Sequence, residues 1–205
     1  MPFFDPKTGL IRCKITYYGP GMAGKTSSLQ HIHRSLPAAA RGPMQSVATE
    51  FERLLFFECS PPGFPAFRGA PLRFHLHTPP GCVLYDRTRD QTLVGADGIV
   101  FVADSQRDKL QENIRRLQQM VRALAHQGRK LADVPIVLQY NKRDIPGALP
   151  VELMDKYLNP LGWPRVGSSL WYRDEDGWSG RSGKGVMEAF ALICRLVAER
   201  LSPTE

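Results

Sequence analysis

The 205-residue sequence contains no run of about 18 apolar residues, so we expect no segment that spans a membrane. Its first six residues lack the basic-then-apolar layout of a secretory signal, and we therefore expect a cytoplasmic protein. Cysteine is scarce, and the four cysteines form no C-x-x-C pair, which favours free buried thiols. The sequence has no internal repeat and no linker long enough to divide the chain. We predict a single domain over residues 1–205.

The composition is typical of a soluble globular protein, with 42% hydrophobic and 23% charged residues and a net charge of +7. An acidic partner, a nucleic acid or an anionic lipid surface would each suit this charge. An excess of Lys and Arg is also ordinary in a nucleotide-binding protein, and we favour that interpretation. We therefore expect no nucleic-acid partner and at most peripheral contact with a membrane.

The most informative stretch runs from residue 19 to residue 26 and matches G-x-x-x-x-G-K-[ST] at every fixed position. Glycine permits a curled backbone whose N–H groups point at an anion, and the following helix adds its positive N-terminal end. Lys25 can reach the β- and γ-phosphates, and the Thr26 hydroxyl can bind Mg²⁺. A glycine-rich turn that matches by chance is the alternative. The expected nucleotide contacts are Gly19, Pro20, Gly21, Met22, Ala23, Gly24, Lys25, Thr26 and Ser27.

The sequence around this loop alternates between strand-like and helix-like segments. A β-rich stretch at 11–18 precedes the loop, and a helix is expected to begin at Thr26. Segments 53–59 and 72–77 are expected to pair as a hairpin. The continuous apolar runs at 98–104 and 134–140 are typical of central parallel strands. This alternation predicts a three-layer α/β fold with a mostly parallel sheet and one antiparallel edge hairpin.

Two helices complete the predicted domain, at 108–127 and at 186–201. The first has an apolar stripe formed by Leu110, Ile114, Leu117, Val121 and Leu124. The basic residues on and around it suit either a docking face or a solvated surface, and we favour a solvated surface. These residues are Arg107, Lys109, Arg115, Arg116, Arg122, Arg129 and Lys130.

A second motif, N-K-x-D, follows the predicted strand at 134–140. The Asp144 carboxylate can accept hydrogen bonds from the adjacent N1–H and N2–H₂ groups of guanine, a pair of donors that adenine lacks. Asn141 can bond the base edge and brace the phosphate loop, while the stem of Lys142 packs against the ring. Further along, Ser179 and Gly180 resemble the start of the Ser-Ala-Lys loop that covers guanine in Ras-like GTPases.

Together these motifs resemble the MglA family, bacterial Ras-like GTPases of gliding motility and cell polarity. The resemblance is carried by residues 17–21, 49–50, 53, 55–57, 73–76, 95–98, 101–105 and 139–144. It implies a Ras-like fold, switching between GTP and GDP, and polarity or motility effectors. It also implies that a roadblock-type homodimer related to MglB activates hydrolysis.

The sequence departs from this family in both switch segments. Where the family has Thr-Val-Pro-Gly-Gln, this chain has Thr78, two prolines, Gly81 and Cys82. A Gln at the last position orients the attacking water, and the Cys82 thiol is shorter and hydrogen-bonds poorly. The resemblance places Thr78, Gly81 and Cys82 at the nucleotide.

In the first switch, Leu54 stands where the family has a Mg²⁺-binding Thr directly after Arg53. Leucine offers no oxygen to this cation, so Thr26, phosphate oxygens and water remain as expected ligands. Arg53 matches the family's catalytic arginine, and a surface ion-pairing role is its alternative.

The segment 162–178 is longer than its counterpart in the family and carries Trp163, Trp171, Tyr172 and Trp178. These aromatic residues suit either interface anchors or packing onto the domain. Two functions fit the whole sequence: a slow GTPase switch, or a guanine-nucleotide-binding scaffold without useful turnover. A kinase or transport ATPase is disfavoured by the N-K-x-D motif.

Overall fold

The computed structural model describes residues 2–48, 53–64, 66–79, 91–173 and 179–201. The α-helices are α1 (Lys25–Ser35), α3 (Leu110–His126), α4 (Val151–Leu158) and α5 (Val186–Glu199), and short 3₁₀ helices span Ala38–Ala40, Arg107–Lys109 and Leu131–Asp133. The strands are β1 (Phe3–Asp5), β2 (Leu10–Tyr18), β3 (Gln45–Ala48), β4 (Arg53–Cys59), β5 (Leu72–His77), β6 (Gly98–Asp104), β7 (Ile136–Asn141), β8 (Arg165–Gly167), β9 (Ser169–Arg173) and β10 (Ser179–Lys184).

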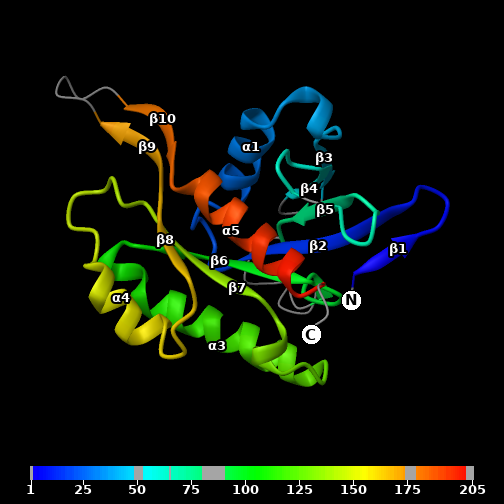
Figure 1. Cartoon of the computed structure of the whole chain (residues 1–205). Coiled ribbons are helices and arrows are strands. Elements are labelled where there is room, and N and C mark those ends of the chain that lie inside the picture. Colours follow the sequence, from blue (N-terminus) through cyan, green and yellow to red (C-terminus); the bar gives the residue numbers. More distant parts are fainter. Residues whose placement is uncertain (1, 49–52, 65, 80–90, 174–178, 202–205) are drawn as a thin grey trace.

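The main sheet has the order β3-β4-β5-β2-β6-β7-β8, and β1 pairs with β2. The pairs β5/β2, β2/β6, β6/β7 and β7/β8 are parallel, whereas β3/β4, β4/β5 and β1/β2 are antiparallel. Helices α1 and α5 lie on one face, and α3 and α4 lie on the other (Figure 1). This three-layer, mostly parallel arrangement confirms the predicted Ras-like α/β fold. The β9/β10 hairpin forms a separate two-stranded sheet.

Most predicted elements are present with nearly the predicted limits. Strands β4, β5 and β6 match the predicted segments, and β4 and β5 pair antiparallel as expected. Strand β7 begins at Ile136 rather than at residue 134. Helix α3 begins at Leu110 because the three residues before it form a 3₁₀ turn. β8, β9, β10 and α4 were not predicted.

The prediction for the buried face of α3 was partly wrong. Leu117 and Leu124 are buried as expected, but Ile114 and Val121 are only partly buried. The buried face instead includes Asn113, whose side chain bonds both the backbone N and O of Asp104 at 2.9 and 2.7 Å. These two hydrogen bonds fix the rotation of the helix on the end of β6. The full set of buried residues on α3 is Asn113, Arg116, Leu117, Met120, Ala123 and Leu124.

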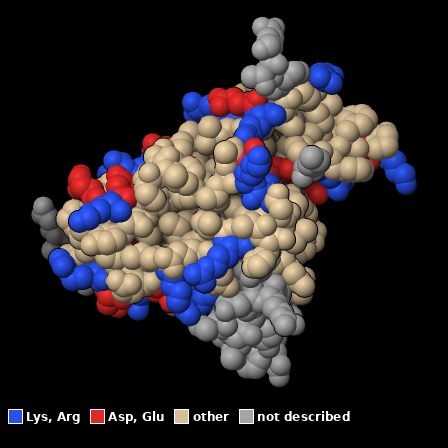
Figure 2. Space-filling model, turned by 90° about the horizontal axis from the view of Figure 1, so that it is seen from below, with Lys and Arg blue, Asp and Glu red and all other residues tan. Residues whose placement is uncertain are grey.

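The solvated surface predicted for the basic residues of this region is wrong for two of them. Arg116 is fully buried, with its guanidinium 2.8 Å from Glu112 and 2.7 Å from Gln119. Arg129 is half-buried and donates to the carbonyl oxygen of Ala96 at 2.6 Å. Seen from below, Lys and Arg are interspersed with Asp and Glu rather than gathered into one patch (Figure 2).

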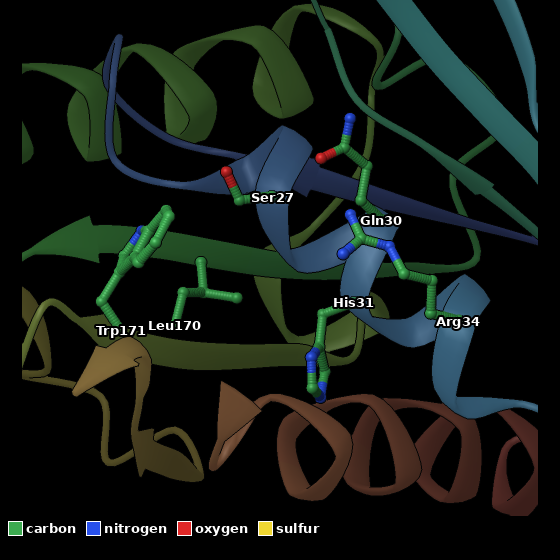
Figure 3. Close-up of a pocket in the computed structure, with 6 residues that line it drawn as sticks. All are labelled: Ser27, Gln30, His31, Arg34, Leu170 and Trp171. Atoms are coloured by element: carbon green, nitrogen blue, oxygen red, sulfur yellow. The ribbon is translucent and has the colours of Figure 1, made fainter. Parts of the chain in front are cut away.

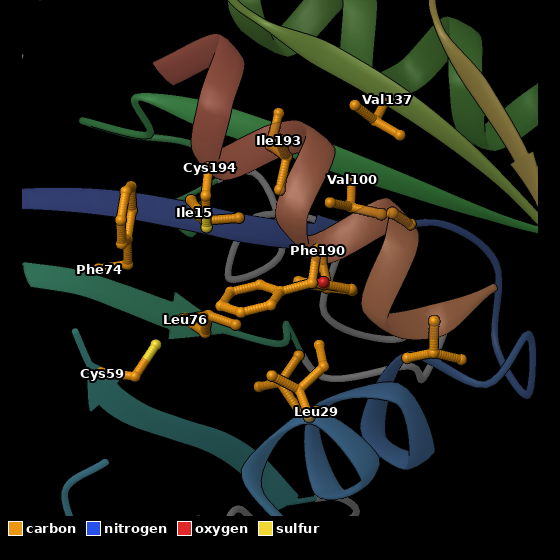
Figure 4. Close-up of a cluster of buried hydrophobic side chains, with 14 of the residues drawn as sticks. Ile15, Leu29, Cys59, Phe74, Leu76, Val100, Val137, Phe190, Ile193 and Cys194 are labelled. Atoms are coloured by element: carbon orange, nitrogen blue, oxygen red, sulfur yellow. The ribbon is translucent and has the colours of Figure 1, made fainter. Parts of the chain in front are cut away.

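The core under α1 and α5 contains three of the four cysteines. Figure 4 shows Cys59 and Cys194 among Phe74, Leu76 and Phe190 in this cluster. Cys13, Cys59 and Cys194 are free and buried, as predicted, and burial raises the pKa of Cys13 and Cys59 to about 12. These thiols are therefore neutral. Cys82 lies outside the described residues.

Helix α5 packs closely on the centre of the sheet at Gly98. A Cβ added there would lie 2.6 Å from the side chain of Val197.

Within the described part of the chain, no helix combines the length and apolar character needed to cross a membrane.

Candidate functional site

The loop between β2 and α1 curls tightly against the ends of β6 and β7. Gly19 has a φ of +139°, and a Cβ there would overlap the carbonyl oxygen of Val102. Gly24 has a φ of +101°, and a Cβ there would overlap the amide nitrogen of Asn141. Met22 also has a positive φ, 59°, and is highly exposed. The two glycines therefore allow a backbone path and an approach that a larger residue would block.

Helix α1 starts at this loop with an N-terminus that suits an anion. Gly24 occupies the N-cap with no side-chain capping hydrogen bond, and the first turn has no acidic residue. The positive end of the helix is thus left for a negatively charged group. Thr26 and Ser27 lie in the same turn and are exposed.

Lys25 places a buried cation inside the loop. Its side chain is 5% exposed, and its ammonium donates to the carbonyl oxygens of Gly19 at 3.2 Å and Pro20 at 2.5 Å. These carbonyl contacts hold the charge at the centre of the curled backbone, where a phosphate group would meet it.

Asn141 connects the N-K-x-D segment to the phosphate loop. Its amide nitrogen donates to the carbonyl oxygen of Ala23 at 2.8 Å, which confirms the predicted brace. Its amide oxygen accepts a hydrogen bond from Ser168 at 3.0 Å. Gln139 donates to Ser168 at 3.0 Å and to Ser28 at 3.1 Å. All these side chains are buried, so the network ties β7, α1 and the residues after β8 into one unit.

Lys142 spans the end of β6 rather than extending into solvent. Its backbone is left-handed, with a φ of 64°, and its ammonium lies 2.6 Å from Asp104 and 3.1 Å from Gln106. Asp104 is only 1% exposed, so this ion pair neutralises a buried carboxylate. The lysine stem is thereby fixed beside Asp144, which is exposed.

The phosphate loop and the N-K-x-D segment line one cleft. Its described lining residues are Met22, Gly24, Ser27, Asn141, Lys142, Asp144, Ile145, Leu170 and Trp171. A neighbouring pocket shares Ser27, Leu170 and Trp171 and adds Gln30, His31 and Arg34 from α1 (Figure 3). Segments more than a hundred residues apart in the sequence therefore meet at the carboxyl ends of the parallel strands, where α/β sheets bind their ligands.

Ser179 and Gly180 lie in a strand rather than in a loop. They lie in β10, opposite Arg173 and Tyr172, in the hairpin. The residue that contacts Asn141 is Ser168, directly after the short strand β8. Because β8 has only three residues, the sequence pattern gave no strand signal to mark the position of Ser168.

The second switch is described only as far as Pro79. Thr78 is buried, and its hydroxyl accepts from the backbone N–H of Leu55 at 3.2 Å and lies 3.4 Å from the Leu55 carbonyl oxygen. These contacts join Thr78 to β4. Gly81 and Cys82 lie outside the described residues.

In the first switch, Leu54 lies in β4 opposite Val47 and is partly exposed. The backbone of Arg53 pairs with Ala48, and its side chain lies outside the described part of the chain, as does Glu50. No group of three or more His, Cys, Asp or Glu side chains that could hold a metal is found among the described residues. The residue for Mg²⁺ predicted from the sequence, Thr26, is exposed at the mouth of the loop.

The described tryptophans of the aromatic segment differ in burial. Trp163 is partly buried against the core under α3 and α4. Trp171 is 48% exposed and borders the cleft. Trp178 lies outside the described residues.

Comparison with known proteins shows a similarity that extends over nearly the whole chain. No protein-family model matches the chain. The chain is 40% identical, over 201 residues, to the "Mutual gliding-motility protein MglA" of Myxococcus xanthus (strain DK1622). The alignment covers 98% of this chain and 98% of the relative, so the similarity extends over every segment that lines the cleft.

Proposed function

The chain belongs to the MglA family, and from this we propose that it binds GTP and GDP in the cleft as a small-GTPase switch of gliding motility or cell polarity. The hydrogen bond from Asn141 to Ala23 is the observation that most supports this assignment. It joins a loop suited to phosphates to a segment suited to guanine, so one ligand carrying both groups would bridge them.

The residues present fit a nucleotide. The curled glycine backbone, the buried ammonium of Lys25 and the uncapped start of α1 are donors for phosphate oxygens. Asp144 is an acceptor suited to the donor edge of guanine. Mg²⁺ bound with the nucleotide would neutralise phosphate charge, and Thr26 is the residue of this chain that would hold it.

Two sequence-based assignments change. We assign Thr78 to holding β4 beside β5, because its hydroxyl contacts Leu55. We also move the base-covering loop from 179–180 to 168–171, because Ser168 bonds Asn141 and Leu170 and Trp171 line the cleft.

We expect GTP hydrolysis to be slow. Phosphoryl transfer requires a positioned water and neutralisation of charge on the γ-phosphate. Cys82 in place of Gln weakens water positioning, and Leu54 in place of Thr removes a ligand for the metal. Arg53 supplies charge but does not position water. A scaffold that binds guanine nucleotide without useful turnover is the second candidate, and these two substitutions favour it.

Further proposals follow from the family. They are an activating roadblock-type homodimer related to MglB, effectors of polarity or motility, a cytoplasmic location and one domain over the whole chain.

Identification of the nucleotide carried by the purified protein tests this function. Heat-denatured protein would be separated from its ligand, which chromatography would identify. GDP supports a working switch, and GTP supports the scaffold. Adenine nucleotide would exclude both.

A further inference from the structure

Trp171 is an exposed aromatic residue on β9, and the residue before it on this strand is in the core. Leu170 is 8% exposed and belongs to the cluster under α1 and α5, whereas Trp171 is 48% exposed. Both residues line the cleft, and Trp171 is the one of the two whose side chain is largely exposed there. Figure 3 shows the indole beside the first turn of α1, near Ser27.

The hairpin that carries Trp171 is held together by its own strand pairing, and it packs against α1. Trp171 itself pairs with Arg181, and Ser169 pairs with Lys184. Gly183 lies so close to the ring of His31 in α1 that a Cβ there would overlap it. The indole is therefore held on a packed element rather than on a free loop.

The cleft around Asp144 offers mainly flat or apolar surface apart from this carboxylate. The lysine stem of Lys142 lies there with Ile145, Leu170 and Trp171. A purine needs a polar partner for its edge and apolar contact for its faces. Asp144 supplies the edge contact, and the indole is the aromatic surface in the described lining.

We propose that Trp171 is a stacking platform for the base of the bound nucleotide. This inference rests on the proposed function and adds a residue that determines affinity rather than base selection, because every base has a π-face. Asp144 selects guanine, and Trp171 retains it. The alternative use of an exposed Trp, as an anchor for a protein partner, predicts no effect on nucleotide affinity.

Tryptophan fluorescence and GDP affinity test the proposal on the full chain. Titration of GDP into the wild-type protein and W171F, with W163F as a matched control, would follow the emission. We expect GDP to quench emission in the wild-type protein and in W163F but not in W171F. W171F should keep its GDP affinity within about threefold, because phenylalanine still stacks.

W171A should weaken GDP binding about tenfold to a hundredfold. Inorganic pyrophosphate, which has no base, should displace bound GDP from W171A at least as easily as from the wild-type protein. If W171A does not fold, W171F decides the question by emission alone. An unchanged quench in W171F, or unchanged GDP affinity in a folded W171A, would overturn the stacking role and leave the guanine site intact. Failure of the wild-type protein to bind GDP at all would overturn the proposed function and this inference with it.

Discussion

Three buried polar side chains, Gln139, Asn141 and Ser168, hold the cleft together at the scale of single residues. Each bonds at least one of the others, and together they reach the phosphate loop through Ala23 and α1 through Ser28. Removing one partner leaves a buried polar group unsatisfied, which costs about 1–3 kcal/mol. The network thus fixes the spacing between the 19–26 loop and the N-K-x-D segment.

His77 is expected to make stability depend on acid pH. Burial, and then the neighbouring His75, lower its pKa to about 3, and the two rings are joined by a 2.9 Å hydrogen bond. His77 therefore has a pKa of about 6.5 in the unfolded state and of about 3 in the folded state, so between these pH values only the unfolded state binds the proton. Stability contributed by neutral His77 is complete above pH 6.5 and is lost as the pH falls below it.

Denaturant unfolding at pH 7 and pH 4.5 would measure this effect. We expect protonation at His77 to lower the free energy of unfolding by about 2 kcal/mol between pH 7 and pH 4.5. His77→Gln should remove most of this decrease. His126→Gln, at an exposed position on α3, is the control, and its free energy of unfolding should depend on pH as in the wild-type protein. If the free energy of unfolding of His77→Gln depends on pH as in the wild-type protein, other groups cause the loss of stability in acid.

At the scale of elements, the β9/β10 hairpin depends on its contact with α1. Gly183 has a φ of +64° and lies against the His31 ring, so Gly183→Ala combines backbone strain with a clash. We expect a loss of about 2–4 kcal/mol, measured by denaturant unfolding, together with weaker GDP binding.

Gly128→Ala provides the matched control for this substitution. Gly128 has a φ of +70° but nothing within 4 Å of an added Cβ, so only strain applies, at about 1–2 kcal/mol. Equal losses in the two variants would show that the contact with His31 contributes nothing.

The sequence predicted the elements whose pattern follows directly from burial. β6 is buried at every position, and its continuous apolar run identified it with the correct limits. The rotation of α3 could not be predicted, because buried Asn113 and Arg116 lie on its inner face in place of apolar residues. Asn113 bonds the backbone of Asp104, a tertiary partner that no local pattern shows, whereas Arg116 bonds Glu112 and Gln119 on the same helix.

The sequence predicted the residues of the candidate site that belong to local motifs. It did not predict the residues that only the folded chain brings to the site. Lys25 and Asn141 follow from their motifs, and the structure joins their segments. Ser168 and Gln139 belong to no motif, and their role depends on bonds between residues 29 positions apart. The sequence showed no strand at 179–180, and in the structure the β9/β10 hairpin lies between Ser168 and α5.

At the scale of the whole molecule, we expect GTP turnover to depend on both switch segments together. Leu54 is partly exposed in β4, so a threonine should fit there, and by the family resemblance Cys82 stands where a Gln is expected to orient the water. We expect Leu54→Thr combined with Cys82→Gln to raise single-turnover GTP hydrolysis by about tenfold or more.

Arg53→Ala in that double variant should lower the rate again, since an arginine at this transition state is worth about 10³–10⁵ in rate. A wild-type protein that already hydrolyses GTP as fast as the double variant would show that another residue positions the water or the metal.

Binding of guanine nucleotide to the whole protein is tested most directly by calorimetric titration with GDP and ADP. The Asp144 carboxylate is expected to accept hydrogen bonds from guanine donors that adenine lacks, and hydrogen bonds to a charged group contribute about 1.5–3 kcal/mol. We expect the wild-type protein to bind GDP at least about a hundredfold more tightly than ADP, and Asp144→Asn to lose about tenfold or more of that preference. Asp133→Asn, an exposed aspartate outside the cleft lining, should bind as the wild type does. Equal affinity of the wild-type protein for GDP and ADP would contradict the guanine site.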